Sequence, residues 1–84
     1  MQIHEIAKTV QTKQDFVNFV GVLLEDYKTN PSNWENRTLE DFLEAMQRWT
    51  EDMEGYYLYN KINLPNDIPW RIFTDILMAA KMYE

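Results

Sequence analysis

Apolar residues recur at helical spacing in two long stretches of this chain, and this pattern constrains the fold more than any other feature. The stripe of the first stretch comprises Leu39, Phe42, Leu43, Met46, Trp49 and Met53. The second stretch begins after Pro69, and its apolar residues are Ile72, Phe73, Ile76, Leu77, Ala79, Ala80 and Tyr83. Repeats of three and four residues place apolar side chains on one face of a helix. The sequence therefore predicts an all-α fold.

Two further helices are predicted ahead of these stretches. The apolar spacing favours a short helix over about residues 1–10, with a strand as the alternative, and a longer helix over about residues 13–28. Thr12 and Asp15 have the spacing of a capping box at the start of the longer helix. Gly21 lies inside that helix, where glycine is unfavourable. We therefore expect Gly21 to mark a close crossing with another helix.

The ends of the last two helices are predicted from capping signals. Thr38 precedes an acidic first turn and is expected to cap the third helix, while Gly55 is its expected end. Residues 56–68 contain three tyrosines and no hairpin signal, so they are expected to form an ordered aromatic loop. The last helix is predicted over about residues 69–83, with Asp67 as its cap.

These elements predict a compact bundle of three main helices plus a short N-terminal helix. A chain of 84 residues forms a single domain, residues 1–84, with a small core. The last helix is apolar around the largest part of its circumference, so it should be the most buried. Phe73 and Leu77 are expected to lie fully buried at the centre of the bundle.

Charge and composition exclude several classes of partner. The net charge is −6, which disfavours binding to nucleic acid phosphates or to an anionic membrane surface. No signal peptide is recognisable, and no apolar run has the length of a membrane span. The chain has no cysteine, which suits a reducing compartment. We expect a soluble cytoplasmic protein that binds neither nucleic acid nor membrane.

The residue types that carry enzyme chemistry are scarce. His4 is the only histidine, no cysteine is available, and Ser32 lies in a predicted turn without the context of a nucleophile. Glu51 and Glu54 could share one cation, but the spacing to Gly55 does not fit a calcium-binding loop. The chain is therefore expected to be no enzyme, with no cofactor and no metal site.

Several short motifs occur in a recognisable order. They are W-E-N-x-T-L at residues 34–39, P-W at residues 69–70 and A-A-K-x-Y-E at residues 79–84. Together they resemble a small bacterial family of uncharacterised single-domain proteins, defined only as a domain of unknown function. The resemblance covers about residues 14–84 and implies no catalytic residue. In size and acidity the chain also resembles the immunity proteins of bacterial toxins, although no motif is shared.

Three carboxylates crowd the predicted last turn of the third helix. Glu51, Asp52 and Glu54 oppose the helix dipole there, and each would cost roughly 0.3–1 kcal/mol at low salt. Such a conflict is typical of functional positions, and a basic partner surface would resolve it. The alternative is internal, with Lys61 or Arg71 folding back onto the acids.

Aromatic residues next to these acids are the second candidate feature. Tyr56, Tyr57 and Tyr59 are expected partner-binding residues, because tyrosine is favoured at binding hot spots. Trp34 and Trp70 are expected in the core. The predicted function is an acidic, immunity-like protein-interaction module that covers a basic partner surface. The alternative is a homodimeric structural or assembly subunit without catalytic activity.

Overall fold

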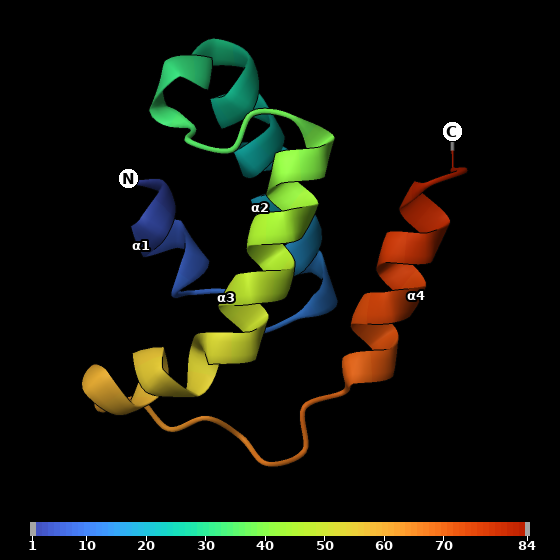
Figure 1. Cartoon of the computed structure of the whole chain (residues 1–84). Coiled ribbons are helices and arrows are strands. Elements are labelled where there is room, and N and C mark those ends of the chain that lie inside the picture. The colour runs from blue at the N-terminus through green and yellow to red at the C-terminus, as the bar shows by residue number, and fades with distance from the viewer. Residues whose placement is uncertain (1, 84) are drawn as a thin grey trace. The chain divides into compact units, whose positions relative to one another are not determined.

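The computed structural model describes residues 2–83, and within them the fold is all-α. This part of the chain contains four α-helices, one 3₁₀-helix and no strand, and Figure 1 shows the path of the chain through them. The elements are α1 (Ile3–Ala7), α2 (Lys13–Thr29), η1 (Pro31–Asn33), α3 (Leu39–Tyr59) and α4 (Trp70–Ala80). The prediction of three main helices plus a short N-terminal one is confirmed, and the strand alternative for the first segment is wrong.

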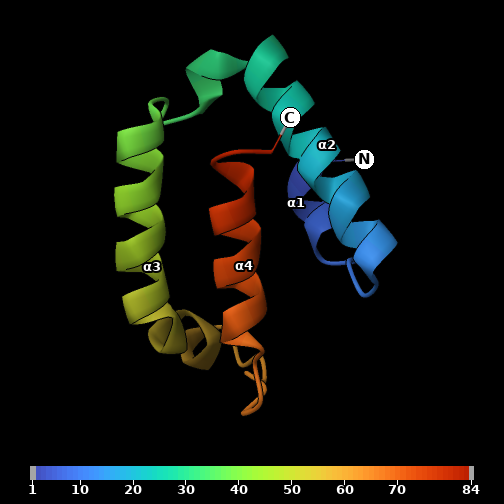
Figure 2. The same ribbon diagram turned by 90° about the vertical axis from the view of Figure 1, so that its right-hand side faces the viewer.

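The chain forms two compact units, Met1–Arg48 and Trp49–Glu84. The first unit contains α1, α2, η1 and the first part of α3. The second unit contains the rest of α3, the connection at residues 60–69, and α4; Figure 2 shows the same elements from another side. The expectation of one domain over residues 1–84 stays a prediction.

Helix α2 begins as its capping signals predict. The backbone N–H of Asp15 donates to Oγ1 of Thr12 at 3.0 Å, and the backbone N–H of Thr12 donates to Oδ2 of Asp15 at 3.2 Å. Both bonds satisfy N–H groups that a helix start leaves unpaired. Helix α1 is shorter than the predicted 1–10, since it covers only Ile3–Ala7.

The expected role of Gly21 is wrong. Within the first unit as the structure describes it, a Cβ atom built at Gly21 would meet no heavy atom within 4 Å, so no close helix crossing is present there. Glycine there lowers helix propensity without any packing benefit.

Helix α3 begins as predicted but ends later. The backbone N–H of Asp41 donates to Oγ1 of Thr38 at 3.1 Å, which confirms Thr38 as the cap. The prediction that Gly55 ends the helix is wrong, because α3 continues to Tyr59 and no glycine has a positive φ. Residues 56–59 of the expected aromatic loop at residues 56–68, which include its three tyrosines, therefore belong to α3. The connection begins only at residue 60.

Lys61 ends α3 instead of a glycine. Its φ of 57° lies in the left-handed region. The N–H of Lys61 donates to the carbonyl of Leu58 at 3.2 Å, and the N–H of Ile62 donates to that of Tyr57 at 2.9 Å. These two bonds define a Schellman motif, which satisfies carbonyl groups at the helix end.

Helix α4 differs most from its prediction. It begins at Trp70 after Pro69, and no side chain caps it, so the prediction of Asp67 as its cap is wrong. Phe73 and Leu77 are 42% and 44% exposed, so their expected complete burial is also wrong. Amphipathic spacing specifies which face of a helix is apolar but not what covers that face.

The buried part of the molecule is small. Met53 on α3 is the one buried apolar residue among those that the structure describes, at 7% exposed. Trp34 is half-buried, while Trp70 is exposed, so the expectation of a core position fails for Trp70.

Candidate functional site

The three predicted acidic residues lie on the exposed surface of α3. Glu51, Asp52 and Glu54 are all exposed, and no ion pair involves them in the described part of the chain. Arg71 instead pairs with Asp75 at 3.1 Å, so the internal pairing with Arg71 is not observed. Because α3 extends to Tyr59, the acids stand before its last turn rather than in it. The conflict with the helix dipole is correspondingly weaker, since that effect is confined to the last turn.

Helical periodicity divides the acidic residues between two faces of α3. Asp52 stands three residues after Trp49 and four before Tyr56, so these three share one face. Glu51 and Glu54 are three residues apart and share another face, together with the exposed Leu58. The six predicted residues therefore do not form one continuous patch.

Three aromatic rings cluster around Trp49. Its ring centroid lies 5.5 Å from that of Tyr56 and 6.4 Å from that of Tyr57, and the two tyrosine rings are 5.2 Å apart. The rings are tilted or edge-on to one another, which is the favoured geometry of aromatic contacts. Tyr59 is 86% exposed and belongs to no aromatic pair in the described structure. The structure thus brings together two of the three predicted tyrosines.

Trp49 was not among the residues predicted for partner binding. The sequence pattern assigns it to the apolar core stripe, but its side chain is 49% exposed and that of Tyr56 is 47% exposed. The seven-residue spacing between Trp49 and Tyr56 would have revealed their common face, provided that the helix was known to continue through Gly55. We call Trp49, Asp52 and Tyr56 the aromatic face of α3.

This aromatic face combines groups that suit protein recognition. Large aromatic side chains contribute most of the energy at many interfaces, and a neighbouring carboxylate adds hydrogen-bond acceptors and negative charge. The three residues are held on one helix, so their spacing is fixed by the backbone.

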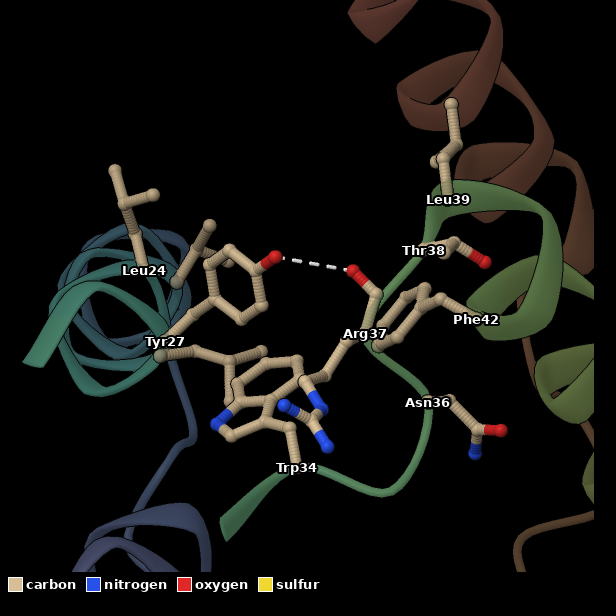
Figure 3. A pocket seen from close by; sticks show the side chains of 10 residues that line it. Leu24, Tyr27, Trp34, Asn36, Arg37, Thr38, Leu39 and Phe42 are labelled. Atoms are coloured by element: carbon tan, nitrogen blue, oxygen red, sulfur yellow. Dashed lines mark hydrogen bonds between the residues drawn. The ribbon is translucent and has the colours of Figure 1, made fainter. Parts of the chain in front are cut away.

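A concave region lies within the first unit, apart from the aromatic face. It is an open, mostly apolar pocket of about 270 Å³ between α2 and the segment that leads into α3, and Figure 3 shows the side chains that line it. Tyr27 and Trp34 line it with ring centroids 5.2 Å apart, and Trp34 stacks on Phe42 at 6.1 Å. The hydroxyl group of Tyr27 donates to the carbonyl oxygen of Arg37 at 3.0 Å. These contacts tie the connection between α2 and α3 to the C-terminal turns of α2.

Neither region offers a ready metal site. Among residues 2–83, no three or more His, Cys, Asp or Glu side chains gather in a way that could hold a metal ion. His4 is exposed on α1.

No helix in the described part of the chain combines the length and the apolar composition needed to cross a bilayer.

Comparison with known proteins places the chain in a family but gives no activity. No curated protein and no solved structure matches it significantly. The profile described as "Family of unknown function (DUF7660)" matches residues 12–84, close to the range over which the sequence motifs show their resemblance. Because this match covers most of the chain, the protein belongs to the family of unknown function DUF7660.

Proposed function

We propose that this protein is an acidic protein-interaction module that binds a basic partner through α3. The observation that supports this most directly is the aromatic face, where Trp49 and Tyr56 remain about half exposed next to the unpaired carboxylate of Asp52. Exposed aromatic residues beside polar groups are typical of binding sites rather than of an ordinary solvated helix surface.

The charge distribution indicates the kind of partner. The net charge is −6, and Glu51 and Glu54 add unpaired negative charge on a neighbouring face of the same helix. Such a field raises the rate of encounter with a positively charged protein surface. Glu51 and Glu54 would act at long range, whereas Asp52 would contact the partner.

A non-catalytic, immunity-like role in a bacterial cytoplasm is the specific form of this proposal. The single histidine, His4, and the lack of cysteine leave few groups for nucleophilic or acid–base chemistry. A protein that only masks a basic surface needs none of these groups. The lack of cysteine also suits a reducing compartment.

The test is affinity capture from the native host, combined with a salt series. The bait is the intact protein, compared with the triple variant Glu51→Gln, Asp52→Asn, Glu54→Gln. We expect a basic protein to be captured by the parent, released as salt rises, and lost from the triple variant. Exposed charges are screened within about 8–10 Å at 0.1–0.15 M salt, which is why the interaction should be salt-sensitive.

A charge-matched control separates the site from the overall charge. The variant Glu25→Gln, Glu35→Gln, Asp67→Asn removes three exposed acids elsewhere, so both triple variants change the net charge from −6 to −3. If both variants lose the captured protein equally, the α3 acids have no special role. If neither loses it, the proposed acidic surface is wrong.

The alternative proposal is a homodimeric structural or assembly subunit, and α4 favours it. This helix has only 11 residues, and isolated helices shorter than about 12–15 residues are marginal in water. Its apolar face, with Trp70, Phe73 and Leu77, is nevertheless exposed and therefore needs a cover. A second copy of the chain could supply one through a two-fold interface.

Sedimentation of the purified protein over a range of concentrations tests this alternative. A dimer through α4 should dissociate on dilution, resist added salt, and be weakened by Phe73→Ser. A sample that remains monomeric at all concentrations contradicts the homodimer.

A further inference from the structure

We infer that the aromatic face of α3 recognises an arginine side chain of the basic partner, an inference that rests on the proposed function. The guanidinium group would stack on the exposed rings of Trp49 and Tyr56 and donate hydrogen bonds to the carboxylate of Asp52.

The geometry of α3 provides both halves of this recognition. The ring centroids of Trp49 and Tyr56 are 5.5 Å apart with planes inclined by 58°, Tyr57 packs against both rings, and Trp49 and Tyr56 still expose 49% and 47% of their surface. Asp52 stands between them in sequence, three and four residues away, which are the spacings of helix neighbours. A cation within about 6 Å of a ring centroid is attracted to the ring face.

Arginine fits this site better than lysine. Its guanidinium group is planar, so it can stack on an aromatic ring and still direct N–H groups to a carboxylate in the same plane. An ammonium group is a compact and strongly hydrated charge that cannot stack. Asp52 has no cation of its own in the described structure, so its carboxylate is available to the partner.

Peptide binding monitored by NMR tests the inference on the full chain. The probes are three flexible Gly/Ser peptides of the same length, which carry arginine, lysine, or the neutral arginine analogue citrulline at the same positions. The indole N–H signal of Trp49 reports on binding. We expect the arginine peptide to bind more tightly than the lysine peptide, by at most the about 2- to 5-fold that a whole exposed cation–ring contact contributes. The citrulline peptide should bind most weakly.

The molecule contains two internal controls. The indole N–H of Trp34 is already bonded to Asp26 at 2.8 Å and lines a different region, so its signal should not follow the titration. Trp70 and Phe73 form an exposed aromatic pair at 5.7 Å, but within α4 no carboxylate stands three or four residues from either ring, so this pair should not attract the arginine peptide.

Matched variants identify the contact residues. Tyr56→Leu and Asp52→Asn should each weaken the arginine peptide by about 2- to 5-fold, whereas Glu25→Gln, which removes an exposed acid on α2, should change its affinity little. Circular dichroism verifies that each variant stays helical. Asp52→Asn alters no packed group, so it gives a result even where Tyr56→Leu lowers stability.

The outcomes separate this inference from the proposed function. Equal affinity for arginine and lysine peptides, or equal losses in Asp52→Asn and Glu25→Gln, would overturn arginine recognition while the salt-sensitive capture of a basic protein still stands. A Trp49 signal that responds to no peptide also overturns it. Loss of the captured protein only in the charge-matched control would overturn the proposed function itself.

Discussion

The indole Nε1–H of Trp34 donates a 2.8 Å hydrogen bond to Oδ2 of Asp26, eight residues earlier in the chain. Asp26 lies in the last turns of α2, and Trp34 directly follows η1. The bond is part-buried and is supported by the edge-on contact between Trp34 and Tyr27. It therefore fixes the direction in which the chain leaves α2 and approaches α3.

Trp34→Phe should destabilise the protein by about 1.5–3 kcal/mol, the range for a hydrogen bond to a charged group. Phenylalanine keeps much of the aromatic contact with Tyr27 but cannot donate to Asp26. Urea unfolding measures the loss. A double-mutant cycle with Asp26→Ala should show strong coupling between the two positions, and purely additive effects would contradict the importance of this bond.

Thr38→Ala should cost about 0.5–2 kcal/mol, because it leaves the backbone N–H of Asp41 without its cap. Thr38→Ser retains the hydroxyl group and is the matched control, with little expected change. The measurement is the urea midpoint at a constant slope of unfolding. Equal stability of the alanine and serine variants would show that the cap is not important in solution.

The helix-capping residues were predicted correctly from the sequence. Thr12 with Asp15, and Thr38 before an acidic turn, act through bonds to backbone groups three residues away, so their outcome does not depend on the rest of the fold. The prediction that Gly55 ends α3 was wrong because a glycine alone does not decide where a helix ends. Glycine is favoured just after a helix end but also occurs inside helices at a cost in stability, and no local signal indicated that Lys61 would adopt the left-handed conformation.

Burial and the composition of the candidate site could not be predicted in the same way. The spacing of Phe73 and Leu77 correctly indicates one apolar face, but the exposure of that face depends on contacts that amphipathicity does not specify. The aromatic face was missed in part because Trp49 and Tyr56 were assigned to different elements. Once α3 is known to be continuous, their common face follows from periodicity.

Gly55→Ala should stabilise the protein by about 0.5–1 kcal/mol, because glycine in the interior of a helix is less favourable than alanine. A Cβ atom at this position meets nothing within 4 Å, so no steric penalty opposes the gain. Gly21→Ala should behave alike, and the two gains should add because a Cβ atom at either site meets no side chain that the two could share. Thermal unfolding provides the measurement. A loss of stability in Gly55→Ala would indicate that α3 ends there after all.

Lys61→Gly should also raise stability, by roughly 0.5–1 kcal/mol. The φ of 57° at Lys61 is unfavourable for a residue with a Cβ atom and natural for glycine, although the greater entropy of glycine in the unfolded chain offsets part of the gain. Lys81→Gly is the matched control, because Lys81 has a φ of −60° in the right-handed region. The same change should therefore destabilise at residue 81, and equal effects at both positions would exclude conformational strain as the cause.

Met53→Ala should be the most costly single truncation of an aliphatic side chain, at about 2–5 kcal/mol, because Met53 is only 7% exposed. Leu77→Ala should cost clearly less, roughly 1 kcal/mol, because Leu77 is 44% exposed and has less burial to lose. Urea unfolding of both variants at one low protein concentration gives the comparison. A cost at Leu77 that equals the cost at Met53 would show that the apolar face of α4 is covered in solution. Repeating the unfolding at higher protein concentration then identifies what covers this face. Binding between chains depends on concentration, so a stability loss in Leu77→Ala that grows with concentration requires a second copy of the chain.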